Sequence, residues 1–196
     1  MSAETSISLL DRVRERGDES SWQTLVEIYT PLIRGWLNRH AGLDADAEDV
    51  IQDVLAVVVR RIPEFRREPR VGAFRAWLRT ITINCFRDAW KSRRRVKPAA
   101  DSRVDEFLQQ LADPASGLSR IWDEEHDRHV TQRLLQIIRG EFTEKTWLAF
   151  QRFALADEPA ETVAADLGMT VNAVFIAKSR VLTALRREGA GLLDEG

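Results

Sequence analysis

Apolar residues recur at helical spacing along most of the chain, and this pattern predicts an all-α protein. A short amphipathic helix is expected over Ile7–Arg16, and a longer helix begins near Ser21 and ends before Gly42, with a kink or restart at Pro31. The next predicted helix, DAEDVIQDVLAVVVRRI, repeats apolar residues every three or four positions, which outweighs the strand tendency of its three consecutive valines. Pro63 is expected to end it.

The segment from Phe74 to Lys97 combines a helical apolar stripe with an excess of basic residues. Cys85, the single cysteine, lies in this stripe, so we expect a small buried side chain and no disulfide within the chain. Between Arg60 and Lys97 there are 13 arginine or lysine residues against three acids, although the chain as a whole carries a formal charge of −2. Such a basic surface predicts nucleic-acid binding through counterion release. A solvated, salt-bridged face is the alternative, which the shortage of acids disfavours.

Acids, prolines, glycines and serines dominate residues 98–128. This composition predicts an acidic interdomain linker with one short helical piece around Phe107–Leu111. The grouping of Glu125, His126 and His129 is interpreted as solvated polar surface. One hypothesis is that the acids of this segment fold back on the basic segment and lower the affinity of the free protein for DNA.

The last third of the chain predicts a second helical domain with a helix-turn-helix. In PAETVAADLGMTVNAVFIAKSRVLTALRRE, the small Ala164, the turn residue Gly168 and the apolar Val174 have the spacing that this motif requires. Thr170 is expected to cap the second helix. The alternative interpretation is an ordinary helical hairpin of a bundle.

Several classes of protein find no support in the sequence. The histidines have no ligand spacing with cysteine and no glycine-rich phosphate loop is present, so we predict no enzyme, no metal and no cofactor. No apolar run approaches the roughly 18 residues of a membrane span. The first residues also lack a signal-peptide pattern, which favours a cytoplasmic protein without membrane insertion.

Three segments, in this order, resemble the sigma-70 family of bacterial RNA polymerase initiation factors, and within it the small extracytoplasmic-function (ECF) group. DAEDVIQDVLAVVVRRIPEF is similar to the family helix that grips the polymerase clamp, and FRAWLRTITINCFRDAWKSRRR is similar to its segment for promoter melting and −10 recognition. PAETVAADLGMTVNAVFIAKSRVLTALRR is similar to its −35 helix-turn-helix. The resemblance implies a sigma-2-like helical bundle over residues 1–97, a linker over 98–128 and a sigma-4-like domain over 129–196.

The resemblance also implies residue roles. The positions that match the polymerase-binding helix are Asp49, Gln52, Asp53, Val54 and Val57. Those that match the −10 segment are Arg66, Arg67, Arg70, Arg79, Asn84, Arg87, Asp88, Lys91, Arg93 and Arg94. Those that match the −35 segment are Thr170, Asn172, Phe175, Ile176, Lys178, Ser179 and Arg180.

Within the −10 set, the side-chain chemistry separates base-reading residues from phosphate contacts. Asn84, Arg87 and Asp88 are expected to read bases, whereas Arg79 and Lys91, with the arginine run, are expected to contact phosphates. Phe175 and Ile176 depart from the more polar positions common in the family. They either contact thymine methyl groups or pack against a neighbouring helix.

The implied function is promoter recognition and transcription initiation. Its partners would be core RNA polymerase, through the clamp coiled coil and the flap, and promoter DNA, with an anti-sigma factor as a further candidate. The alternative is a helix-turn-helix transcription regulator that binds DNA without polymerase. In that case the acidic helix would be a dimer interface or part of the core.

Overall fold

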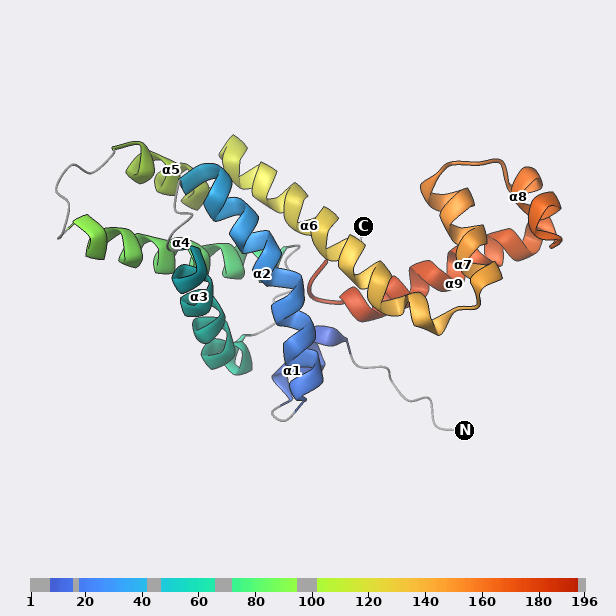
Figure 1. Cartoon of the computed structure of the whole chain (residues 1–196), viewed down its shortest axis with the longest axis horizontal. Helices are drawn as coiled ribbons and strands as arrows, with labels where there is room; N and C mark the ends of the chain where they lie inside the picture. Colours follow the sequence, from blue (N-terminus) through green and yellow to red (C-terminus); the bar gives the residue numbers. More distant parts are fainter. Residues whose placement is uncertain (1–7, 16–17, 42–46, 66–71, 95–101, 194–196) are drawn as a thin grey trace.

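The chain folds into α-helices, as the hydrophobic pattern predicts. A computed structural model describes residues 8–15, 18–41, 47–65, 72–94 and 102–193, and this described part contains nine α-helices and no β-strand (Figure 1). The helices are α1 (Leu9–Arg14), α2 (Glu19–Ala41), α3 (Ala47–Arg61), α4 (Ala73–Arg94), α5 (Ser102–Ala112), α6 (Gly117–Ile138), α7 (Glu144–Phe150), α8 (Ala160–Leu167) and α9 (Val171–Gly189).

Helices α1 to α4 pack around one hydrophobic core. The apolar stripe predicted for α4 faces this core, with Phe74 only 1% exposed and Cys85 buried, as expected for both. Phe65 and Trp77 lie beside Phe74, and the ring centroids of the three are 5.0 to 5.5 Å apart. Trp77 is partly buried against the core, which agrees with a packing role rather than a free stacking platform.

Helix α2 continues through Pro31, so of the predicted kink or restart there, the restart does not occur. Its first turn is capped by Asp18, whose carboxylate accepts a hydrogen bond from the backbone N–H of Ser21 at 3.2 Å. The same carboxylate accepts hydrogen bonds from the hydroxyls of Ser20 and Ser21. A carboxylate here satisfies an N–H that lacks a partner within the helix and complements the helix dipole.

The prediction that residues 98–128 form a mostly irregular linker is wrong for the described part of that segment. Residues 102–112 form α5, which buries Val104, Leu108 and Leu111 in the N-terminal core. These three residues are spaced four and three positions apart, so they share one face of the helix. The short helical piece predicted around Phe107–Leu111 is therefore part of a longer helix, whose full length the acidic composition obscured.

Helix α6 also begins within the segment that was predicted to be a linker. The Ser116 hydroxyl caps it by accepting a hydrogen bond from the N–H of Ser119 at 3.0 Å. Trp122 is fully buried and meets Trp36 of α2 edge-on, with ring centroids 4.9 Å apart. The N-terminal bundle therefore comprises α1 to α5 together with the first part of α6.

The C-terminal helices form the predicted helix-turn-helix. Helices α8 and α9 enclose an angle of 101°, within the range that DNA-binding motifs of this kind show. Gly168 ends α8 in the left-handed conformation (φ 57°), which a residue with a Cβ rarely adopts. Thr170 caps α9, with its hydroxyl accepting a hydrogen bond from the N–H of Ala173 at 3.1 Å. Val163 and Val174 are fully buried where the two helices meet.

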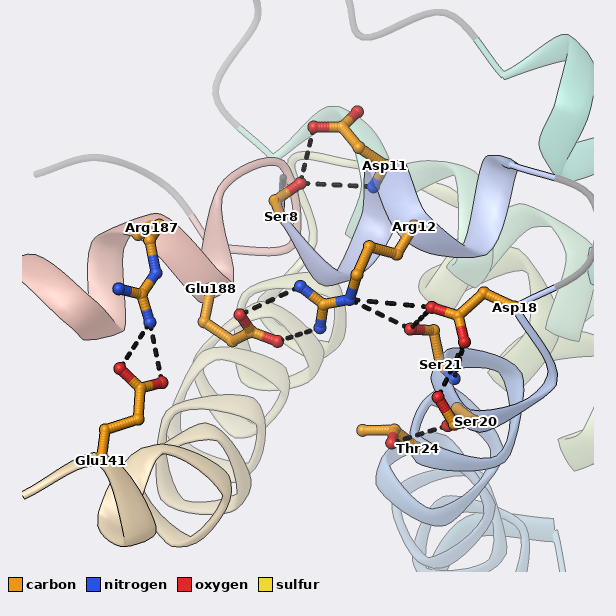
Figure 2. A network of polar contacts seen from close by, with 10 residues as sticks. All are labelled: Ser8, Asp11, Arg12, Asp18, Ser20, Ser21, Thr24, Glu141, Arg187 and Glu188. Carbon is orange, nitrogen blue, oxygen red and sulfur yellow. Dashed lines mark hydrogen bonds and ion pairs between the residues drawn. The ribbon is translucent and has the colours of Figure 1, made fainter. Parts of the chain in front are cut away.

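Helix α6 joins the two ends of the molecule, because it reaches from the N-terminal bundle to α9 (Figure 1). Val130 and Leu134 lie in the N-terminal core, whereas Ile138 packs with α7 and α9. An ion pair also links the first helix to the last (Figure 2). Both terminal nitrogens of Arg12 in α1 donate hydrogen bonds to the carboxylate of Glu188 in α9, which is only 5% exposed.

Candidate nucleic-acid interface

The outward face of α4 carries a polar strip. Asn84, Asp88 and Lys91 are exposed and Arg87 is half-buried, and their spacing places all four on one side of the helix. The Arg87 guanidinium donates a hydrogen bond to the Asn84 side-chain oxygen at 3.3 Å, so the two polar groups lie next to each other. The opposite side packs into the core through residues such as Phe86, which is 1% exposed. The helix thus presents an amide, a guanidinium and a carboxylate from a fixed backbone.

Arg79 does not belong to this strip, and the prediction that it contacts phosphates is contradicted by its burial. Its side chain is 8% exposed and donates hydrogen bonds to the Asp123 carboxylate at 3.0 Å and to the Ser119 carbonyl at 3.4 Å. A buried guanidinium needs such partners because an unpaired charge in the core is costly. Arg79 therefore joins α4 to α6 and offers no free charge to a polyanion.

Next to Arg79, a partly buried polar network joins α4 to α6 and α2. A terminal nitrogen of Arg75 lies 2.6 Å from the Asp127 carboxylate, which also accepts a hydrogen bond from His126 Nδ1 at 2.9 Å. The other ring nitrogen of His126 lies 3.1 Å from the Tyr29 hydroxyl. Burial, followed by the nearby charge of Asp127, raises the pKa of Tyr29 well above its ordinary value. The hydroxyl therefore stays protonated at neutral pH and ties α2 to α6.

The Asp127 carboxylate stays ionised in this network. Burial acts to raise its pKa, but the hydrogen bond from His126 and the charge of Arg75 outweigh that effect and lower the pKa. The interpretation of this region as solvated surface is wrong for His126, which is fully buried, and His129 is bound through Nε2 to the Ile28 carbonyl at 2.7 Å. Sequence reading missed these roles because the partners lie on helices far away in the chain.

Several predicted −10 residues fall outside the described structure. Arg66, Arg67 and Arg70 lie in the undescribed stretch 66–71. Arg93 and Arg94 extend the backbone of α4, but their side chains are not among those described. Their assignment to DNA binding stays a prediction.

Helix α3 presents an acidic outer face. Asp49, Gln52 and Asp53 are exposed on it, as the resemblance implies. Val54 was predicted to contact a partner, but it is fully buried in the core and cannot do so in this fold. Val57, the other predicted apolar contact, is only partly exposed and packs against the same core.

One outward apolar residue of α3 was missed. Val59 is 48% exposed and lies seven positions after Gln52, so the two share a face of the helix. The helical phase of the three consecutive valines could have identified it, since Val58 in the buried stripe turns Val59 outward. The outer face of α3 therefore combines acids with one exposed apolar side chain.

The outward face of α9 differs in character. Asn172, Phe175, Ile176 and Ser179 are exposed along it, and Arg180 is exposed beside them. The predicted residue Lys178 is half-buried, and its ammonium lies 5.1 Å from the ring centre of Phe153 in a cation–π contact. Thr170 is exposed but uses its hydroxyl as the helix cap.

Metal sites and membrane spans are the other kinds of site to consider in the described residues. No group of three or more histidine, cysteine, aspartate or glutamate side chains there could hold a metal ion. No single helix in the described ranges is both long and apolar enough to cross a bilayer, and the bent α8–α9 pair reaches that threshold only when its two helices are combined.

Comparison with known proteins identifies the family. The family described as Sigma-70 region 2 matches residues 25–96, from α2 to the end of α4. The RNA polymerase sigma factor CarQ of Myxococcus xanthus is 33% identical over 128 residues, which cover 65% of this chain and 68% of CarQ.

Two further relatives are named as ECF RNA polymerase sigma factors. RpoE of Cereibacter sphaeroides is 26% identical over 92 residues, covering 47% of this chain and half of that protein. SigE of Mycolicibacterium smegmatis is 28% identical over 96 residues, covering 49% of this chain and 36% of SigE. The chain thus spans about half the length or less of these two relatives and about two thirds of CarQ. On these matches, the chain belongs to the sigma-70 family of RNA polymerase sigma factors, in its ECF group.

Proposed function

We propose that this chain acts as a sigma factor that binds core RNA polymerase and directs it to promoters, using α4 at the −10 element and α9 at the −35 element. The observation that carries the proposal is the family match over residues 25–96, which contains both the acidic face of α3 and the polar strip of α4. The separate helix-turn-helix at the other end of α6 supports a second DNA contact. A sigma factor works on polymerase, so its site of action is the cytoplasm.

For the −10 element, the polar strip of α4 supplies the base-reading groups. Asn84 and Arg87 can donate hydrogen bonds to base edges, while Asp88 can accept them. Lys91 lies further along the strip and is better placed to neutralise a phosphate, which gives affinity without sequence information. Arg79 takes no part, because it is buried with Asp123.

For polymerase binding, the outer face of α3 is the proposed surface. Asp49, Gln52 and Asp53 supply a polar, acidic rim, and Val59 replaces Val54 as the apolar contact. Rim charges steer an encounter with a basic partner, and the apolar group that becomes buried adds affinity. The clamp coiled coil of core polymerase is the expected partner of this face. The flap is the expected partner of the C-terminal helices. An anti-sigma factor that covers either surface stays a prediction.

Run-off transcription tests the proposal. Purified protein with core polymerase should start transcription at defined positions on genomic fragments, whereas core polymerase alone should not. Replacing Asp49 and Asp53 by lysine should abolish the start sites and the complex with core polymerase, because the new charges repel a basic partner. The control Glu106→Lys, at an exposed position of α5, should leave both intact. Specific DNA binding without any polymerase complex would favour the alternative, a regulator that acts alone.

A further inference from the structure

Two large apolar side chains stand outward on the helix proposed to meet the −35 element. Phe175 and Ile176 are each 49% exposed, whereas the core-facing residues Val174, Ala177 and Val181 of the same helix are at most 3% exposed. The apolar pair is therefore not part of the stripe that anchors α9. Single exposed apolar residues are common on protein surfaces, but two large ones side by side form a small apolar patch of the kind that marks contact sites.

Phe175 is held in its outward position by a neighbour. The Phe153 ring, in the π-helical segment Gln151–Leu155, meets Phe175 edge-on with centroids 5.2 Å apart and an interplanar angle of 81°. The ammonium of Lys178 lies 5.1 Å from the centre of the same Phe153 ring. The contact fixes one side of Phe175 and leaves about half of the residue exposed, so packing against a neighbouring segment accounts for only part of its surface. Ile176 belongs to neither C-terminal core cluster of the described residues.

The surroundings of the pair indicate what it meets. Asn172 and Ser179 lie one turn before and after on the same face, and Arg180 is exposed beside them. Among the described residues, no carboxylate forms an ion pair with Arg180. Hydrogen-bonding groups and a free cation around a small apolar centre fit a polar, anionic surface that carries isolated apolar groups. In the major groove of DNA the only such group is the C5 methyl of thymine.

We propose that Phe175 and Ile176 read thymine methyl groups, so that the −35 element contains A·T pairs where the middle of α9 faces it. The inference rests on the proposed function, because it requires α9 to lie in the major groove. It names the apolar pair as a specificity determinant and leaves the hydrogen-bonding residues Asn172 and Ser179 to the flanking base edges.

Replacing thymine by uracil tests the inference, since this removes the methyl group and leaves base pairing unchanged. The probes are duplexes with the −35 segment of a promoter mapped by run-off transcription, with thymine or uracil at every thymine position of that segment. Polymerase reconstituted with the wild-type chain should bind the uracil duplex about four-fold more weakly for each methyl group that is contacted, the factor expected for one buried CH2-sized group. The measurement uses unchanged protein, so a misfolded variant cannot mislead it.

Variants then assign the effect to these side chains. Phe175→Ala and, separately, Ile176→Thr should reduce the difference between the two duplexes. The control Ile137→Ala, at a residue that is 43% exposed on α6, should keep it. Equal binding of both duplexes by the wild type, with discrimination against a scrambled −35 segment intact, would overturn the inference and leave the proposed function standing.

Other outcomes are equally decisive. Mapped promoters without an A·T pair in the −35 segment would contradict the inference. So would a Phe175→Ala, Ile176→Thr chain that forms the polymerase complex and still distinguishes thymine from uracil as the wild type does, because the pair would then not contact the methyl groups. Absence of any promoter-specific binding would overturn the proposed function, and the inference with it.

Discussion

The basic segment of α4 and the outward face of α9 are both assigned to DNA, yet they use their charges differently. In α4, Arg75 and Arg79 are committed to the carboxylates of Asp123 and Asp127, and the free strip begins only at Asn84. In α9, the exposed Arg180 has no such partner among the described residues. A count of basic residues therefore overestimates the DNA-binding surface of α4. Burial decides which arginines stabilise the fold and which remain for a ligand.

The largest expected effect comes from breaking the α4–α6 ion pair. Asp123→Ala should lower the free energy of unfolding by about 2–3 kcal/mol, because it leaves the buried Arg79 guanidinium without its carboxylate. Arg180→Ala on α9 should change it by about 0.5 kcal/mol or less, since that side chain is exposed. Urea unfolding followed by circular dichroism measures both. Equal effects at the two positions would contradict the contrast between the helices.

The acids of α6 allow a test of whether they screen the basic segment of α4 from DNA. If they only screened the basic segment, neutralising Asp123, Glu124, Glu125 and Asp127 together would raise DNA binding by the free protein without loss of stability. The structure pairs Asp123 and Asp127 with the largely buried Arg79 and Arg75, so we expect a loss of stability to accompany any gain in binding. Unchanged DNA binding at low salt would remove the screening hypothesis.

An intermediate effect is expected in the salt dependence of promoter binding. Lys91→Ala should lower affinity uniformly across promoter sequences and reduce the slope of log K against log salt by about 1, because one phosphate contact is lost. Arg79→Lys keeps the buried charge and should leave the slope unchanged. Fluorescence anisotropy of the holoenzyme on labelled promoter DNA at several salt concentrations provides the slopes. A decrease for Arg79→Lys equal to that for Lys91→Ala would place Arg79 at the DNA after all.

The smallest effect concerns the two helix starts. Hydrogen bonds from Ser21 and then Ser20 lower the pKa of Asp18, the cap of α2, from 3.8 to about 2. A lowered folded-state pKa adds stability that is present above the unfolded value and is lost as the pH falls from about 4 to about 2. Thr170, the cap of α9, has no charge to titrate.

Unfolding measured between pH 5 and pH 2 tests this difference. Asp18→Asn should be slightly less stable than the wild type at pH 5, and the gap should close toward pH 2. Thr170→Ser should run parallel to the wild type across the range. A gap for Asp18→Asn that does not depend on pH would show that the cap works through shape rather than charge.

Much of the fold followed from local pattern. The buried stripe of α4 with Cys85, the acidic first turn of α3 and the turn at Gly168 were all readable, because each depends on neighbours within one or two helical turns. The burial of Arg79 was not readable, since Asp123 lies 44 positions further along the chain. The extent of α5, of which only a short piece around Phe107–Leu111 was predicted, and the start of α6 were missed for a different reason. Their acids suggested a solvated linker, while the periodic Val104, Leu108 and Leu111 indicated a helix with a buried side.

The assignment of site residues shows the same limit. The phase of a helix separates its inner and outer faces, so Asn84 and Gln52 could be placed outward from sequence. Successive residues differ by about 100° around the axis, so neighbours can differ fully in burial, as the exposed Asp53 and the buried Val54 show. Phe175 and Ile176 needed the structure, since only their exposure in the fold distinguishes core packing from an outward role.

The continuity of α6 has a consequence for how the molecule opens. Its 22 residues extend about 33 Å, with one part packed in the N-terminal bundle and its end packed beside α7 and α9. Unfolding of α6 from one end would either break the helix or pull its buried side chains out of the core at the opposite end. Backbone amides in the middle of α6 should therefore exchange with deuterium among the slowest in the protein, through concerted opening of both ends.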